Sequence, residues 1–141
     1  MTTPAPTTID HSALTKKSVL VVDDEGSIRF FLKKFLSSLG VREIAEASNG
    51  QEALTYVQAH PKVNLVLLDL KMPVMDGVSV LKEIRAVAPE AAVVVVTGYP
   101  YYQGADHLFA EGAFEFVVKP VDIDYLEQIV RVSLLVKQNP A

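Results

Sequence analysis

Short runs of apolar residues alternate along this chain with longer stretches in which apolar residues recur every three or four positions. Short apolar runs are typical of buried parallel strands, and the longer periodic stretches are typical of amphipathic helices. The strands are predicted at residues 19–22, 43–46, 64–68, 92–96 and 114–118. The helices are predicted at residues 27–39, between Ser48 and Pro61, and at residues 78–87, 103–111 and 122–137.

This alternation predicts an α/β protein of the (βα)5 type, because short connections make each β-α-β unit right-handed and place helices on both faces of a parallel sheet. The expected strand order is 2-1-3-4-5, as in a flavodoxin-like doubly wound sheet. Ser48 and Gln51 have the spacing of a capping box, so Ser48 is the predicted N-cap of the second helix. Residues 1–16 are rich in Thr and Pro and carry no periodicity, so we expect a flexible tail there.

Composition narrows the classes of partner. Half of the 141 residues are hydrophobic and 21% are charged, which is typical of a globular domain. The formal net charge is −4 and no long basic stretch occurs, which argues against direct binding of nucleic acid or an anionic membrane surface. The absence of cysteine excludes disulfides, thiolate metal sites and cysteine nucleophiles. No signal peptide or run of about 18 apolar residues is present, so we expect a cytoplasmic protein.

Polar residues follow four of the predicted strands. Asp23 and Asp24 follow the first strand, Asp69 the third, Thr97 the fourth and Lys119 the fifth. The carboxyl ends of parallel strands meet at one edge of a sheet, so these side chains are expected to converge. Three carboxylates in one cleft repel each other unless a cation joins them, and Mg²⁺ prefers oxygen ligands while leaving room for phosphate oxygens.

The remaining polar groups fit a phosphoryl group beside that cation. Lys119 can balance its charge, and the Thr97 hydroxyl can donate a hydrogen bond to one of its oxygens. Asp69 lies between the predicted metal side and the lysine side, so it is the better placed nucleophile for an acyl phosphate. Taken singly, Asp23 and Asp24 fit a helix N-terminus and Lys119 fits a solvated surface. Their combination favours a site for Mg²⁺ (or Mn²⁺) and a phosphoryl group.

Four motifs, in this order and at this spacing, resemble the signature of two-component response-regulator receiver domains (CheY-like). They are VVDDE at residues 21–25, DLKMPVMDG at 69–77, TG at 97–98 and FVVKP at 116–120. The resemblance covers about residues 17–137. It implies a receiver domain at residues 17–138, followed by a short C-terminal end at 139–141 with no output domain.

The resemblance implies roles for the acidic residues. Asp69 matches the phosphoacceptor for a histidine kinase or histidine phosphotransfer protein. Asp23 and Asp24 match the acidic pair that binds Mg²⁺ together with Asp69 and the backbone carbonyl of Lys71. Such a protein is a signalling phosphoacceptor that assists its own phosphorylation and dephosphorylation, and is not otherwise an enzyme.

The resemblance also implies a switch. Thr97 and Phe116 occupy the positions of the switch pair, in which the threonine moves toward the phosphoryl group and the aromatic residue rotates inward. Phe116 stands where tyrosine is frequent, so it lacks the hydroxyl of that residue. Lys119 matches the family's lysine, and its bond to Pro120 is expected to be cis.

Three residues near the site are expected to tune the lifetime of the phosphoryl group. Gly98 follows Thr97 and is small enough to leave the site open. Lys71 stands two residues after Asp69 and Tyr99 two after Thr97, where each is able to border the path of a hydrolytic water.

The last predicted helix is apolar over more than half its circumference, wider than contact with one sheet face requires. Its two neighbouring stripes are Ile123, Leu126, Val130 and Leu134, and Tyr125, Ile129, Val132 and Val136. One explanation is a helix packed on two sides. The other is that the fourth helix, fifth strand and last helix form a homodimer or a surface for a downstream protein.

Three other functions remain as alternatives. One alternative to a stand-alone receiver is a receiver fragment of a larger regulator with a DNA-binding or ATPase output. An aspartyl-phosphate phosphohydrolase typically needs a second aspartate two residues after the nucleophile, where this chain has Lys71. A flavin-binding module of the same fold needs a phosphate-binding turn after the first strand, and the acidic residues 23–25 argue against it.

Overall fold

The computed structural model describes residues 13–71, 76–98 and 104–135. In this part of the chain, strands and helices alternate as the apolar pattern predicts. The elements are β1 (Ser18–Val22), α1 (Gly26–Ser38), β2 (Glu43–Ala47), α2 (Gly50–Ala59), β3 (Leu65–Leu68), α3 (Gly77–Val87), β4 (Ala92–Thr97), α4 (Gly104–Ala110), β5 (Glu115–Val118) and α5 (Ile123–Leu135).

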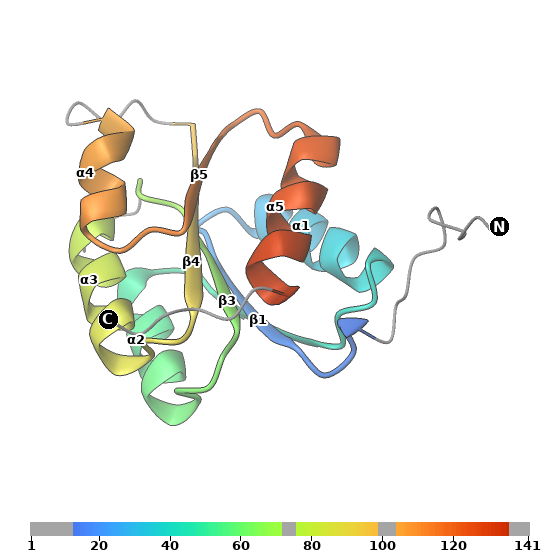
Figure 1. The fold of residues 1–141 in the computed structure, drawn as a ribbon, viewed down its shortest axis with the longest axis horizontal. Helices are drawn as coiled ribbons and strands as arrows, with labels where there is room; N and C mark the ends of the chain where they lie inside the picture. Colours follow the sequence, from blue (N-terminus) through green and yellow to red (C-terminus); the bar gives the residue numbers. More distant parts are fainter. Residues whose placement is uncertain (1–12, 72–75, 99–103, 136–141) are drawn as a thin grey trace, which may run out of the picture.

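The strands form one five-stranded parallel sheet in the order β2-β1-β3-β4-β5, which confirms the predicted fold class. Helices α1 and α5 cover one face of the sheet, and α2, α3 and α4 cover the other (Figure 1). None of the helices in the described ranges is long and apolar enough to cross a membrane.

Two hydrophobic cores lie on the two faces of the sheet because successive strand residues point in opposite directions. In β3, Val66 and Leu68 belong to the core beneath α2 and α3, whereas Leu65 and Leu67 belong to the core beneath α1 and α5. All four side chains are buried. β3 is therefore apolar at every position, which explains why it appears in the sequence as a continuous apolar run.

The capping box of α2 lies one residue later than predicted. Asn49, not Ser48, is the N-cap, and its side-chain oxygen accepts a hydrogen bond from Glu52 N at 2.8 Å. The Glu52 carboxylate accepts a bond from Ser48 N at 2.7 Å. The difference arises because the helix begins at Gly50, which makes Glu52 rather than Gln51 its third residue.

The ordered domain begins before the predicted end of the tail. Leu14 is fully buried and belongs to the core under α1 and α5, although residues 1–16 were predicted as a tail. Residues 1–12 lie outside the described ranges. A single apolar residue in a polar stretch has no periodicity, so the sequence contained no sign of this contact.

The apolar stripes of α5 divide differently from the prediction. Its buried residues Leu126, Ile129, Val130, Ser133 and Leu134 form a single stripe at i, i+3, i+4, i+7 and i+8. Ile123, from the first predicted stripe, is exposed, and so are Tyr125 and Val132 from the second. Val136, the last member of the second stripe, lies outside the described residues.

Candidate functional site

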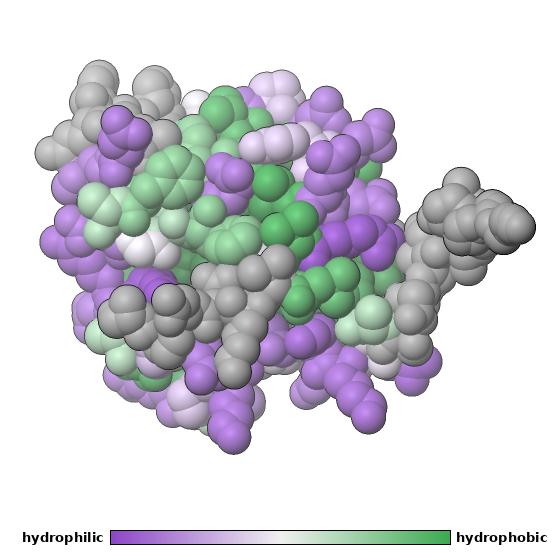
Figure 2. Space-filling view, in the orientation of Figure 1, coloured by the Kyte–Doolittle hydropathy of each residue, from purple (hydrophilic) through white to green (hydrophobic). Residues whose placement is uncertain are grey.

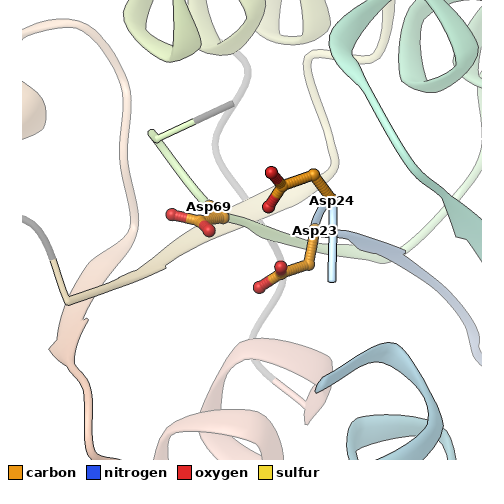
Figure 3. Close-up of side chains that lie close together, drawn as sticks. All are labelled: Asp23, Asp24 and Asp69. Carbon is orange, nitrogen blue, oxygen red and sulfur yellow. The ribbon is translucent and has the colours of Figure 1, made fainter. Parts of the chain in front are cut away.

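The acidic cluster forms where β1 and β3 end side by side. Val22 and Leu68 are paired in the sheet, and Asp69 N donates a hydrogen bond to the carbonyl of Val22 at 3.0 Å. The next residues, Asp23 and Asp69, are thereby placed next to each other. Together with Asp24, they bring carboxylate oxygens within 4.8 Å of one another (Figure 3).

Asp23 is 1% exposed, and the structure satisfies both of its side-chain oxygens. Its Oδ1 accepts a hydrogen bond from Glu25 N at 2.9 Å, and its Oδ2 accepts one from Lys119 Nζ at 2.8 Å. Its backbone N–H donates to Ala47 O in β2 at 3.1 Å. Asp24, in contrast, is exposed on the turn, and its carboxylate lies near those of Asp23 and Asp69.

Asp69 is 6% exposed and lies beside both Asp23 and Lys119, which also contact each other. Its Oδ1 accepts a hydrogen bond from Lys71 N at 3.0 Å, and its Oδ2 lies 3.3 Å from Lys119 Nζ. Lys119 follows β5 and is placed by its backbone N–H, which donates to Thr97 O at 3.1 Å. One ammonium group therefore binds two buried carboxylates that come from different strands.

The charge of Lys119 is stabilised despite its partial burial. Desolvation is the largest single influence and opposes the charged form, but the hydrogen bond to Asp23 and the charges of Asp69 and Asp23 outweigh it. The pKa of Lys119 is consequently raised above its ordinary value. Three carboxylates still face one ammonium group, so the site retains negative charge and attracts a cation.

A cleft of about 460 Å³ opens over these residues, large enough for a phosphoryl group and a hydrated cation. It is lined by Asp24, Glu25, Asp69, Lys71, Thr97, Gly98 and Lys119. Thr97 is buried at the end of β4. A Cβ atom added at Gly98 would lie 3.3 Å from Lys119 Cβ, so glycine here leaves the lysine room in the cleft.

The donor set fits a hard divalent cation. The three carboxylates offer only oxygen atoms, and no cysteine is present in the chain to favour a softer metal. Asp24 faces the cleft, which leaves space for water on the cation. These features match the preference of Mg²⁺ for carboxylate oxygens and retained waters.

The structure brings together all five residues predicted at the strand ends. The peptide bond between Lys119 and Pro120 is cis. Phe116 is half-buried in β5 and packs against the core beneath α2, α3 and α4. Tyr99 lies outside the described residues.

Arg29 is a contributor to the site that the motifs did not indicate. It lies in α1, and its Nη1 donates a hydrogen bond to the backbone carbonyl of Asp23 at 2.7 Å. The available signal was an arginine five residues after the acidic pair, near the start of the predicted helix. That signal has no meaning until the helix is placed over the turn.

The fold and the arrangement of charged groups define a phosphoryl-accepting signalling domain. The sequence profile of the response regulator receiver domain matches residues 19–131. This chain therefore belongs to the family of response-regulator receiver domains, as its four motifs indicated.

Individual relatives agree with this assignment. Regulatory protein AtoC of Escherichia coli (strain K12) is 38% identical over 117 residues, covering 82% of this chain and 25% of that protein. Sporulation initiation phosphotransferase F of Bacillus subtilis (strain 168) is 32% identical over 126 residues, covering 89% of this chain and 100% of that protein. Among solved structures, the CheX–CheY–BeF3–Mg²⁺ complex from Borrelia burgdorferi contains a chain with a TM-score of 0.81 and 32% identity, covering 92% of this chain and 96% of that one.

The relatives differ in length. This chain spans about a quarter to a half of several curated relatives, among them AtoC and a probable transcriptional regulator of Cyanophora paradoxa. Family membership therefore defines the receiver domain and its phosphoacceptor function in two-component signalling. Output, partners and pathway belong to the individual protein.

Proposed function

We propose that Asp69 accepts a phosphoryl group from the phosphohistidine of a histidine kinase or histidine phosphotransfer protein. The observation that carries this proposal is the position of the Asp69 carboxylate, which lines the cleft together with Thr97 and Lys119 and has an oxygen within 4.8 Å of carboxylate oxygens of Asp23 and Asp24. Mg²⁺ (or Mn²⁺) would be held by Asp23, Asp24, Asp69 and the backbone carbonyl of Lys71. The related Borrelia structure, which contains BeF3 and Mg²⁺, supports this assignment by analogy.

The transfer requires alignment and charge neutralisation more than acid–base chemistry. An oxygen of Asp69 forms a bond to phosphorus while the phosphorus–nitrogen bond of the donor breaks. The electron pair of that bond remains on the imidazole nitrogen of the donor. Lys119 balances the charge of the phosphoryl oxygens and the Thr97 hydroxyl donates a hydrogen bond to one of them. A bound divalent cation would supply further neutralisation of the carboxylate and phosphoryl charges.

Phosphorylation then changes a protein-binding surface through Thr97 and Phe116. Phe116 is half-buried on β5 and packs against the core beneath α2, α3 and α4, so a change in its rotamer would change the exposed surface of β5. Lys71, Gly98 and Tyr99 tune the lifetime of the acyl phosphate, and two of these line the cleft. The domain is a signalling phosphoacceptor in the cytoplasm and not an enzyme that turns over small substrates.

The surface whose binding of a partner responds to phosphorylation is the one formed by α4, β5 and α5. Apolar side chains gather over this region in Figure 2. Val118 is 58% exposed, and Phe109, Tyr125, Val132 and Leu135 are also exposed. Exposed apolar groups that cluster in this way are typical of interaction surfaces. We infer that a downstream protein or a second copy of the chain binds here.

Intact-mass spectrometry after incubation with acetyl phosphate tests the proposal. The wild-type protein is expected to gain one phosphate in the presence of Mg²⁺ and none with EDTA. Asp69→Asn is the matched control because it keeps the shape and removes the nucleophilic oxygen. A phosphate adduct of equal yield on Asp69→Asn would refute the assignment of Asp69. If no adduct is seen on the wild type, a beryllofluoride titration separates fast hydrolysis, which leaves binding intact, from a site that takes no phosphate.

A further inference from the structure

Arg29 joins three segments of the fold: the turn after β1, the start of α1 and strand β2. Its Nη1 donates to Asp23 O at 2.7 Å, and its Nε donates to Glu46 Oε1 in β2 at 2.7 Å. Its backbone N–H, at the start of α1, bonds to Glu25 O at 3.1 Å. The arginine thus holds both ends of the acidic turn formed by residues 23–25.

The acidic turn is closed by the Asp23 side chain, whose Oδ1 accepts from Glu25 N at 2.9 Å, but Asp24 and the side chain of Glu25 do not add to this support. Helix α1 begins at Gly26, and its N-cap residue Glu25 makes no side-chain capping hydrogen bond. Asp24 is exposed, and no hydrogen bond holds its carboxylate within the described part of the chain. The direction of the Asp24 side chain therefore depends on the backbone of the turn, which Arg29 anchors at the carbonyl of Asp23.

We propose that Arg29 is a positioning residue for the acidic site: it fixes the turn that presents Asp23 and Asp24, so that both carboxylates face the cation together with Asp69. This inference rests on the proposed function, because it assigns Arg29 a role toward the divalent cation. The guanidinium group suits the task since its planar fork donates to Asp23 O and Glu46 at once. Groups that orient the ligands of a metal typically change its affinity 10–100-fold when they are removed.

The positive charge of Arg29 and its hydrogen bond to Asp23 have opposite effects on the affinity of the site for a divalent cation. A cationic side chain near the site repels a divalent cation, so loss of charge alone would strengthen cation binding. Glu46 moderates this repulsion, because its carboxylate pairs with both Arg29 and Lys33 at 2.7 Å. Removal of the Arg29 side chain therefore weakens cation binding if positioning dominates and strengthens it if charge repulsion dominates.

The experiment is a Mg²⁺ titration followed by ¹H–¹⁵N NMR of the whole chain, with thermal unfolding in EDTA as a separate measure of stability. Arg29→Met keeps the aliphatic stem and removes the donor, and we expect the Mg²⁺ dissociation constant to rise about tenfold. Arg29→Lys keeps the charge but has one nitrogen for two acceptors, so a loss of about threefold is expected. Lys33→Met is the matched control, because it removes a charge and a partner of Glu46 on the same helix without touching Asp23.

The expected pattern is weaker Mg²⁺ binding in Arg29→Met, a smaller loss in Arg29→Lys and a change of less than about twofold in Lys33→Met. Unchanged or tighter binding in Arg29→Met would overturn the inference while leaving the proposed function intact. An equal loss in Lys33→Met would also overturn it, since only charge or Glu46 would then matter. If Arg29→Met does not fold, Arg29→Lys decides in its place, with unchanged affinity counting against the inference. A wild-type protein that binds no Mg²⁺ would refute the proposed cation site itself, and the inference with it.

Discussion

Replacement of Gly77 by alanine is expected to destabilise the domain and disturb the backbone beside Asp69. Gly77 is the first residue of α3 and is buried. An added Cβ would lie 2.6 Å from Leu70 Cα and 2.8 Å from Leu70 O. Both are backbone atoms, so no change of rotamer relieves the contact. Normal carbon contacts of about 3.5–4.0 Å then require a shift of about 1 Å.

The magnitude follows from two opposing effects. Overpacking in a buried region costs about 1–3 kcal/mol, and a clash with backbone belongs near the upper end. Replacing glycine in a helix by alanine contributes about 0.5–1 kcal/mol in favour of folding. We therefore expect Gly77→Ala to lower the free energy of unfolding by about 2 kcal/mol. Because Leu70 joins Asp69 to Lys71, whose N–H bonds Asp69 Oδ1, the yield of phosphorylated protein should fall as well.

Gly26 provides a matched control, since it is the first residue of α1. A Cβ added there would meet only Arg29 Nη2 at 3.5 Å, which is an ordinary contact. Gly26→Ala is therefore expected to be neutral or to stabilise by about 0.5 kcal/mol. Urea unfolding followed by circular dichroism measures both variants, because the chain has no tryptophan for fluorescence. If Gly77→Ala proved as stable as the wild type, or if both variants lost equal stability, the steric reasoning would be wrong.

Three other predictions concern the core and the buried charges. Leu14→Ala should lower the free energy of unfolding in urea by about 3 kcal/mol, because Leu14 is fully buried. A decrease below about 1 kcal/mol would mean that residues 13–17 are not packed on the core. Lys119→Met should lower the free energy of unfolding in EDTA by about 3 kcal/mol, since it leaves the Asp23 and Asp69 carboxylates buried without the lysine ammonium group. Added Mg²⁺ should restore part of this stability, and no response to Mg²⁺ would contradict this account. The pKa of Lys119 is raised in the folded state, so its ion pairs contribute fully below the ordinary lysine pKa of about 10.4 and are lost as the pH rises through the folded-state value. Unfolding at pH 9 and pH 11 should therefore show a larger alkaline loss in the wild type than in Lys119→Met, and equal losses would refute the sign.

Much of the site was predictable from sequence because its charged and polar residues directly follow the buried strands. Topological rules place the ends of β1 and β3 together, which predicted that Asp23, Asp24 and Asp69 would cluster. The same rules brought Thr97 and Lys119 to that edge. The capping box was placed one residue early because Ser48 and Asn49 are both good caps, and only the first helical residue distinguishes them.

Contacts made across the fold were beyond the reach of periodicity. Arg29 contacts the carbonyl of Asp23 only because α1 packs back over the end of β1. The hydrogen bond from Arg29 to Glu46 also requires that β2 lie beside β1. Leu14 is buried because the segment before β1 folds against the core under α1 and α5. The exposure of Ile123 depends in turn on which stripe of α5 faces the sheet.

The sequence by itself determined the order of strands and helices, the parallel sheet and the set of groups at its carboxyl edge, because these depend on local periodicity and on general rules of chain connection. Only the tertiary structure decided how the groups pair. Lys119 binds Asp23 across 96 residues of chain, and Asp69 across 50. Desolvation lowers the pKa of Lys119, but the hydrogen bond to Asp23 and the charges of Asp69 and Asp23 outweigh it and raise that pKa, and this balance exists only once the strands have been brought together.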